Sequence, residues 1–131
     1  MAFKLNSETR KLRTPDNSTF KFGRRDVPIR KVDLEGTTLG EANMDGTISL
    51  DKSVDENSPM GRKVVNHELS HVEDIESGKA SYDDNWVMWE GEKYDRKNGK
   101  IKYKGTWYAE GDNSLPWEKK AVRAENREHY A

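Results

Sequence analysis

Two histidines and a glutamate stand together in the motif His67-Glu68-Leu69-Ser70-His71. On an α-helix, residues four apart lie one turn apart on the same face, so the imidazoles of His67 and His71 can converge on one divalent ion. Histidine nitrogens are common zinc ligands. Glu68 points to another side of the helix, where its carboxylate can accept a proton from a water molecule at the metal. The motif therefore predicts a zinc site with the residues of a metal-assisted hydrolase.

The residues around the motif predict one helix over 59–77. Ser58 is a favourable N-cap, and Pro59 suits the first helical position. Gly78 is typical of the position just beyond the end of a helix. Both histidines then fall in the middle of the helix, where the backbone is rigid. The helical period also predicts a stripe that faces the core, formed by Val65, Leu69, Val72 and either Ile75 or Glu76.

Before this helix, the sequence predicts β structure. A weak alternation over 19–22 suggests a short strand, and broken alternation of apolar residues suggests another over 27–34. The dipeptide Asp45-Gly46 predicts a type I′ turn of a hairpin that joins residues 38–42 to residues 47–50.

After the helix, Asn98-Gly99 predicts a second hairpin, in which Ile101 and Tyr103 share one face. The aromatic residues of this region are expected to fill the core. A last helix is expected over 114–130, with a packing stripe of Trp117, Ala121 and Ala124.

A zinc site of this kind uses three protein ligands. The chain has no cysteine, so the third ligand is expected to be a carboxylate or the remaining histidine. Glu118 is the first choice, because it follows the large anchor Trp117 in the first turn of the last helix. Glu125, two turns further along, and His129, near the chain end, stay open as alternatives.

The HExxH helix itself does not offer the third ligand. Asp74 lies a further turn beyond His71, and a side chain there is too far along the helix to reach the same ion. We expect it to be a capping, supporting or surface group. Metzincins carry a glycine three residues after the second histidine and a histidine or aspartate three residues later. Here those positions are Asp74 and Ser77, which argues against that class.

Length and composition limit the number of domains, the partners and the location that we expect. A chain of 131 residues is expected to form one domain, with residues 1–26 as an N-terminal arm that is loosely ordered in part. The 23 basic and 24 acidic residues give a formal net charge of −1, which offers no electrostatic case for nucleic acid or an anionic membrane. The N-terminus has no apolar signal segment, so we expect a cytoplasmic location, or a virion if the chain is encoded by a phage.

The sequence Asn66-His67-Glu68-Leu69-Ser70-His71, followed by Leu115-Pro116-Trp117-Glu118-Lys119-Lys120-Ala121, resembles the minimal gluzincin-type zinc metallopeptidases of bacteria and bacteriophages. The resemblance spans residues 37–125. It implies a zincin-like α+β fold, in which a β-hairpin or small antiparallel sheet packs on the HExxH helix and a C-terminal helix follows. It also implies that Glu68 is the catalytic base and that the zinc ligands are His67, His71 and Glu118.

The chain departs from one branch of that family. Thermolysin-like members have an aspartate four residues after the third ligand, where this chain has Val122. Membership of that branch is therefore not expected, and the resemblance does not say which residue orients the histidines.

These observations predict a zinc-dependent endopeptidase that acts on peptide or protein substrates through a metal-activated water, with Glu68 as general base. Tyr103, Tyr108 and His129 have the chemistry to stabilise an oxyanion, and the strand over 47–50 could pair with an extended peptide. Two other functions stay open. One is a non-catalytic zinc-binding structural or accessory protein of the virion type, and the other is an α+β interaction protein without metal.

Overall fold

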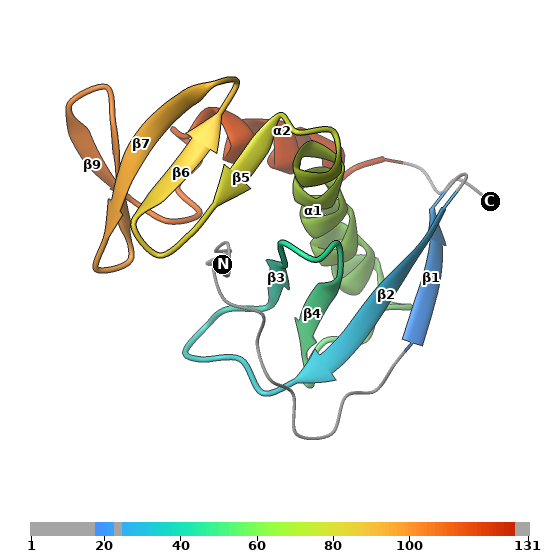
Figure 1. Ribbon diagram of the computed structural model, residues 1–131. Helices are drawn as coiled ribbons and strands as arrows, with labels where there is room; N and C mark the ends of the chain where they lie inside the picture. The colour runs from blue at the N-terminus through green and yellow to red at the C-terminus, as the bar shows by residue number, and fades with distance from the viewer. Residues whose placement is uncertain (1–17, 23–24, 128–131) are drawn as a thin grey trace.

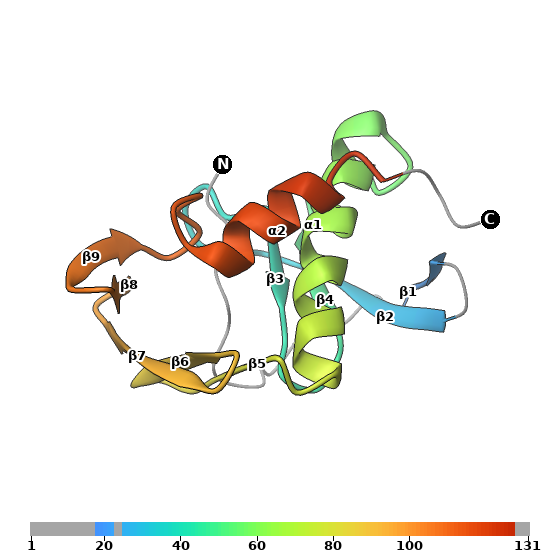
Figure 2. The same cartoon turned by 90° about the horizontal axis from the view of Figure 1, so that it is seen from above.

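The computed structural model describes residues 18–22 and 25–127, and it confirms an α+β architecture. A long central helix, α1 (Pro59–Glu76), lies between two sheets (Figure 1). A shorter helix, α2 (Pro116–Ala124), lies across α1 (Figure 2). Within the described residues, neither helix has the length and apolar character needed to cross a membrane. The centre of the fold is therefore the contact between α1, α2 and the two sheets.

The first sheet has four strands, in the spatial order β1-β2-β4-β3. Its strands are β1 (Ser18–Phe22), β2 (Arg25–Val32), β3 (Gly40–Ala42) and β4 (Ile48–Asp51). Both the strand predicted over 19–22 and the one predicted over 27–34 are present. The sheet is mixed, because β2 and β4 run parallel whereas the other pairs are antiparallel. The predicted antiparallel pairing is thus found between β1 and β2 and between β3 and β4, but not between β2 and β4.

The hairpin predicted at Asp45-Gly46 is present between β3 and β4, but its turn differs from the prediction. Gly46 has a φ of +87°, whereas Asp45 does not have the positive φ that a type I′ turn requires at both central residues. The backbone N–H of Asn43 donates to Thr47 O at 2.9 Å, and the N–H of Gly46 donates to Asn43 O at 3.0 Å. The connection is therefore a three-residue loop that ends in a glycine bulge.

The residues that predicted the two ends of α1 have the expected roles. The Ser58 hydroxyl accepts a hydrogen bond from the Gly61 N–H at 2.9 Å, and Pro59 occupies the first turn. Gly78, with a φ of +81°, ends the helix. The predicted core stripe is buried, and of the two residues offered for its last position Ile75 packs against the core while Glu76 is exposed.

The second sheet is a five-stranded antiparallel meander, in the order β5-β6-β7-β8-β9, where only a short strand pair was expected. Its strands are β5 (Ala80–Tyr82), β6 (Trp86–Trp89), β7 (Glu92–Lys97), β8 (Lys100–Tyr103) and β9 (Thr106–Ala109). The predicted turn Asn98-Gly99 has positive φ at both residues, as a type I′ turn requires. Glu90-Gly91 and Lys104-Gly105 repeat this geometry at the neighbouring connections. Three of the four connections in the meander are therefore tight turns of this type.

Trp117 joins the meander to α2. Its side chain is 1% exposed, and its ring lies 5.9 Å from the rings of both Trp89 and Tyr94 and 6.1 Å from Tyr103. Ala121 and Ala124 complete the predicted stripe and are buried. Because Glu118 follows Trp117 directly, this aromatic cluster fixes the start of α2 and, with it, the position of Glu118.

The last helix is shorter than predicted. It ends at Ala124, with Glu125 as its C-cap, and residues 128–130 of the predicted helix lie outside the described residues. The end of a helix leaves carbonyl groups without partners in the helix. Here the Asn66 side chain of α1 donates to the carbonyls of Glu125 and Arg127, at 3.3 and 3.2 Å. This contact ties the end of α2 to α1.

Candidate metal centre

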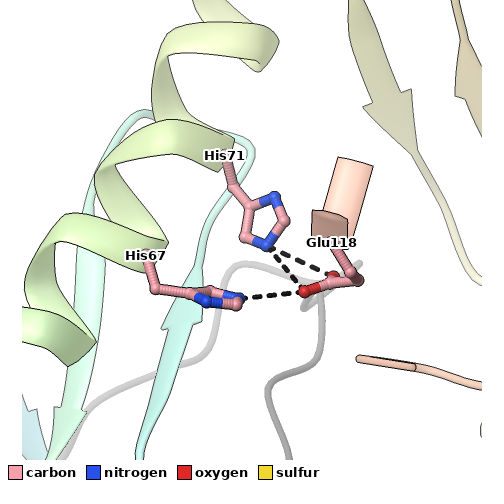
Figure 3. Close-up of side chains that lie close together, drawn as sticks. All are labelled: His67, His71 and Glu118. Atoms are coloured by element: carbon pink, nitrogen blue, oxygen red, sulfur yellow. Dashed lines mark hydrogen bonds and ion pairs between the residues drawn. The ribbon is translucent and has the colours of Figure 1, made fainter. Parts of the chain in front are cut away.

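Three potential metal ligands converge between α1 and α2 (Figure 3). His67 and His71 come from successive turns of α1, and Glu118 comes from the first turn of α2. The Nε2 atom of His67 lies 2.9 Å from Glu118 Oε1, and the Nε2 atom of His71 lies 3.2 Å from Glu118 Oε2. All three side chains are buried, with exposures of 0 to 3%. The structure thus brings together the three residues that the sequence singled out.

The donor set fits a zinc ion. The three ligand atoms all lie within 4.8 Å of one another. Zinc holds nitrogen and oxygen ligands at about 2.0–2.1 Å in tetrahedral sites, which places neighbouring ligand atoms roughly 3.3 Å apart. The separations between Glu118 and the two histidines, 2.9 and 3.2 Å, are close to this value, so the three donors are placed as the ligands of a single ion would be. Two imidazoles and one carboxylate leave a fourth coordination position for water or substrate.

The charges of the three groups are strongly linked. Burial alone would raise the pKa of Glu118, but the charge of His71 and hydrogen bonds from both histidines hold it at about 2. Burial alone would lower the pKa of His71, but the charge and hydrogen bond of Glu118 raise it to about 9. In the metal-free protein the site is therefore a buried ion pair. A metal ion held through Nε2 would need the imidazole in its deprotonated form.

His67 is held on both sides of its ring. Its Nε2 atom faces Glu118, and its Nδ1 atom lies 2.8 Å from Glu125 Oε2. Both ring nitrogens thus have a carboxylate partner, which can accept a hydrogen bond from a nitrogen that carries a proton. Burial lowers the pKa of His67, but the hydrogen bond with Glu118 and the charge of Glu68 outweigh burial and raise it. Glu125, the alternative third ligand, thus lies on the side of His67 that faces away from Glu118.

Glu68 is buried in a different way. It is fully enclosed, and neither of its carboxylate oxygens has a hydrogen-bond partner among residues 18–22 and 25–127. Burial raises its pKa to about 7, although the charges of His67 and His71 oppose that shift. A Cβ atom added to Gly40 of β3 would lie 3.0 Å from Glu68 Cγ and 3.2 Å from Glu68 Oε2. Glu68 therefore lies between α1 and β3, where its carboxylate interacts with the charges of both histidines.

Of the remaining residues considered as ligands, the structure describes Asp74 but not His129. Asp74 does not lie on the surface, because it is buried and forms an ion pair with Lys120 of α2. Its carboxylate forms no hydrogen bond with the three donors among the described residues, so a supporting role for it stays a prediction. His129, the remaining alternative ligand, lies outside the described residues.

Of two other site predictions, the oxyanion donor stays a prediction, and the strand that pairs with a peptide is wrong. Tyr103 and Tyr108 form no hydrogen bond or ring contact with the three donors in the part of the chain that the structure describes. The strand over 47–50 cannot pair with a peptide at its edge, because β4 is flanked by β2 and β3. The edge strand beside α1 is β3.

Sequence reasoning missed two residues that support the site. Glu125 was considered only as a ligand, and Asn66 was quoted in the motif without a role. The spacing of seven between Glu118 and Glu125 was a usable signal, because it places both carboxylates on one face of a helix, two turns apart. For Asn66 there was no such signal, since its partners are backbone carbonyls far away in the sequence.

Comparison with known proteins gives no match to the chain, whether with protein-family models, curated proteins or solved structures. The functional argument therefore rests on the geometry of the site.

Proposed function

We propose that this protein is a zinc-dependent metallopeptidase with a zincin-like fold, similar to the small gluzincin-type enzymes. One observation carries the proposal. Three buried donors from two helices converge, and the residue directly after the first histidine is a buried carboxylate without a hydrogen-bond partner in the described chain. A buried carboxylate without a partner is costly to maintain, so its presence beside a potential metal site favours a chemical role.

The residues divide into holding and reacting groups. His67, His71 and Glu118 would hold the ion. Zinc, when bound, supplies a Lewis acid that polarises a carbonyl group and lowers the pKa of water. Glu68 would accept a proton from the attacking water and pass it to the leaving amine, and burial, which raises the pKa of its carboxyl group, favours that task. This division assigns a task to each of the four buried side chains.

The substrate is proposed to be an extended peptide that runs along β3. This strand is the edge of the first sheet on the side of α1, and Gly40 within it faces Glu68. Among the described residues the outer edge of β3 has no strand partner, although all three of its residues are buried. The backbone of an unpaired edge can take up a peptide in an extended conformation. The balanced charge of the chain favours a peptide or protein over nucleic acid or an anionic membrane. We place the protein in the cytoplasm or in a virion as part of the same proposal.

A second function is favoured by the burial of the site. Glu118 connects α2 to α1 through both histidines, and a zinc ion there would fasten the two helices together. A purely structural zinc protein would use the same ligands without hydrolysis. Structural zinc sites are normally closed by four protein ligands, however, whereas only three donors gather here among the described residues. We therefore rank this function second.

The two functions are separated by one experiment. The protein is stripped of metal with a chelator, and hydrolysis of a mixed peptide library is followed by mass spectrometry before and after one equivalent of zinc is restored. The peptidase requires cleavage that disappears with the metal and returns with zinc. Zinc binding with a raised melting temperature but no cleavage of any peptide would favour the structural function.

A further inference from the structure

Glu125 stands out because its side chain contacts a proposed metal ligand, His67, but has no task in the proposed mechanism. Its Oε2 atom lies 2.8 Å from Nδ1 of His67, and its side chain is 17% exposed. The contact joins the end of α2 to the middle of α1, across 58 positions of sequence. Glu125 is therefore connected to the proposed metal centre without facing the position of the ion.

The geometry separates Glu125 from the proposed ligands. A histidine that binds a metal through Nε2 carries its proton on Nδ1, and that N–H needs an acceptor to fix the tautomer and the plane of the ring. Glu118 occupies the Nε2 side of His67, and Glu125 occupies the Nδ1 side. The carboxylate of Glu125 is thus placed as the acceptor for the Nδ1–H.

Asn66 holds Glu125 in this position. Its side-chain amide donates to the carbonyl oxygens of Glu125 and Arg127, and it directly precedes His67 on α1. Arg127 in turn pairs with Glu73 of α1 at 3.0 Å. Two neighbouring residues of α1 therefore bind the end of α2: Asn66 fixes its backbone, and His67 meets its carboxylate.

We infer that Glu125 is a positioning residue, which fixes the orientation and tautomer of His67 by accepting its Nδ1–H. This inference rests on the proposed metal centre. It also answers what replaces the aspartate that thermolysin-like enzymes carry four residues after the third ligand. Here the supporting carboxylate lies seven residues after Glu118, which is two helical turns rather than one.

The test compares Glu125→Ala and the isosteric Glu125→Gln with wild type, and Asn126→Ala serves as a control because it is exposed and adjacent. Zinc affinity is measured by competition with a chromophoric chelator. We expect Glu125→Ala to weaken zinc binding about 10- to 100-fold, as is typical for loss of a carboxylate behind a ligating histidine. Glu125→Gln keeps an acceptor oxygen and should lose less, whereas Asn126→Ala should match wild type.

A spectroscopic measurement separates positioning from a general structural effect. Long-range ¹H–¹⁵N spectra of the zinc-loaded protein report which nitrogen of each histidine carries the proton, and the chain has only three histidines. The inference expects a single Nδ1–H tautomer for His67 in wild type and a changed His67 signal in Glu125→Ala, with His71 unaltered. Unchanged zinc affinity and an unchanged His67 signal in Glu125→Ala would overturn the role of Glu125 but leave the metal centre in place. Wild type that binds no zinc would refute the metal centre itself.

Discussion

The carboxylate of Glu118 lies 2.9 Å from Nε2 of His67, although 51 positions separate the two residues. This contact, together with the one to His71, places the third potential ligand on a different helix from the first two. The site therefore exists only when α1 and α2 are packed together. Folding and metal binding are expected to depend on each other.

The first prediction concerns the third ligand. Glu118→Ala removes the only carboxylate that faces both histidines in the described chain. With two ligands left, zinc affinity should fall by more than 100-fold, since two imidazoles alone make a weak site. Lys119→Ala is the matched control, because it lies next to Glu118 on α2 but is exposed. Equal zinc affinity in Glu118→Ala and Lys119→Ala, measured by calorimetry, would remove Glu118 from the site.

The second prediction concerns Glu68. Glu68→Gln keeps the shape of the side chain but cannot accept a proton, so hydrolysis should fall about 10²- to 10⁴-fold while zinc remains bound. The same change should stabilise the metal-free protein at pH 8, because burial makes the ionised carboxylate unfavourable. Peptide cleavage and urea unfolding of the same preparation give both values. A variant that keeps full activity would exclude Glu68 as the base.

The third prediction concerns pH. In the metal-free protein the pKa of Glu68 is raised from 4.5 to about 7, and that of His71 is raised from 6.5 to about 9. Between pH 4.5 and 9 the folded state therefore binds more protons than the unfolded state, and its stability should fall as pH rises. The pKa of Glu118 is shifted in the opposite direction, from 4.5 down to about 2. The stability that its carboxylate contributes is therefore lost as the pH falls below 4.5.

Zinc should oppose this fall in stability as the pH rises. Zinc binds deprotonated imidazole, so the additional stability that it confers should increase as the pH rises. Urea unfolding at pH 5.5, 7 and 8.5, with and without one equivalent of zinc, measures both slopes. A metal-free protein that becomes more stable from pH 5.5 to 8.5 would contradict the buried ion pair between Glu118 and His71.

The fourth prediction tests how α2 is anchored. Trp117→Ala removes the ring that contacts Trp89, Tyr94 and Tyr103, and it should destabilise the protein by about 3–5 kcal/mol. The control is Trp107→Ala, because Trp107 is 43% exposed and should contribute far less. Chemical denaturation compares the two. Similar losses in both variants would show that the aromatic cluster does not hold α2.

The fifth prediction concerns the approach of β3 to α1. A Cβ atom at Gly40 would lie 3.0 Å from both Glu68 Cγ and Val64 Cγ1, so Gly40→Ala must push the strand or Glu68 aside. The expected cost is about 1–3 kcal/mol, with reduced hydrolysis but unchanged zinc affinity, since Gly40 does not contact the donors. Zinc binding and cleavage measured together check this. A loss of zinc affinity would show that β3 supports the ligands directly.

Much of the framework could be predicted because its signals are local. The cap at Ser58, the glycine at position 78 and the turn at Asn98-Gly99 each depend on the conformation of a few neighbouring residues. The spacing of His67 and His71 likewise follows from the helix alone. These features need no knowledge of the rest of the fold.

The features that could not be predicted depend on contacts between distant parts of the chain. The parallel pairing of β2 with β4 is set by the packing of both strands, because no turn dipeptide joins parallel neighbours. The tie between Asn66 and the end of α2 depends on where a second helix stops. Glu125 was placed on the correct helix face, but only the packed structure shows which nitrogen of His67 it meets.

The most direct test is anomalous diffraction at the zinc edge from crystals of the protein with one equivalent of zinc. We predict a single strong peak within bonding distance of Nε2 of His67, Nε2 of His71 and the Glu118 carboxylate, with Glu125 still at Nδ1 of His67. A peak at another place, or none between these three side chains, would contradict the metal centre and the function built on it.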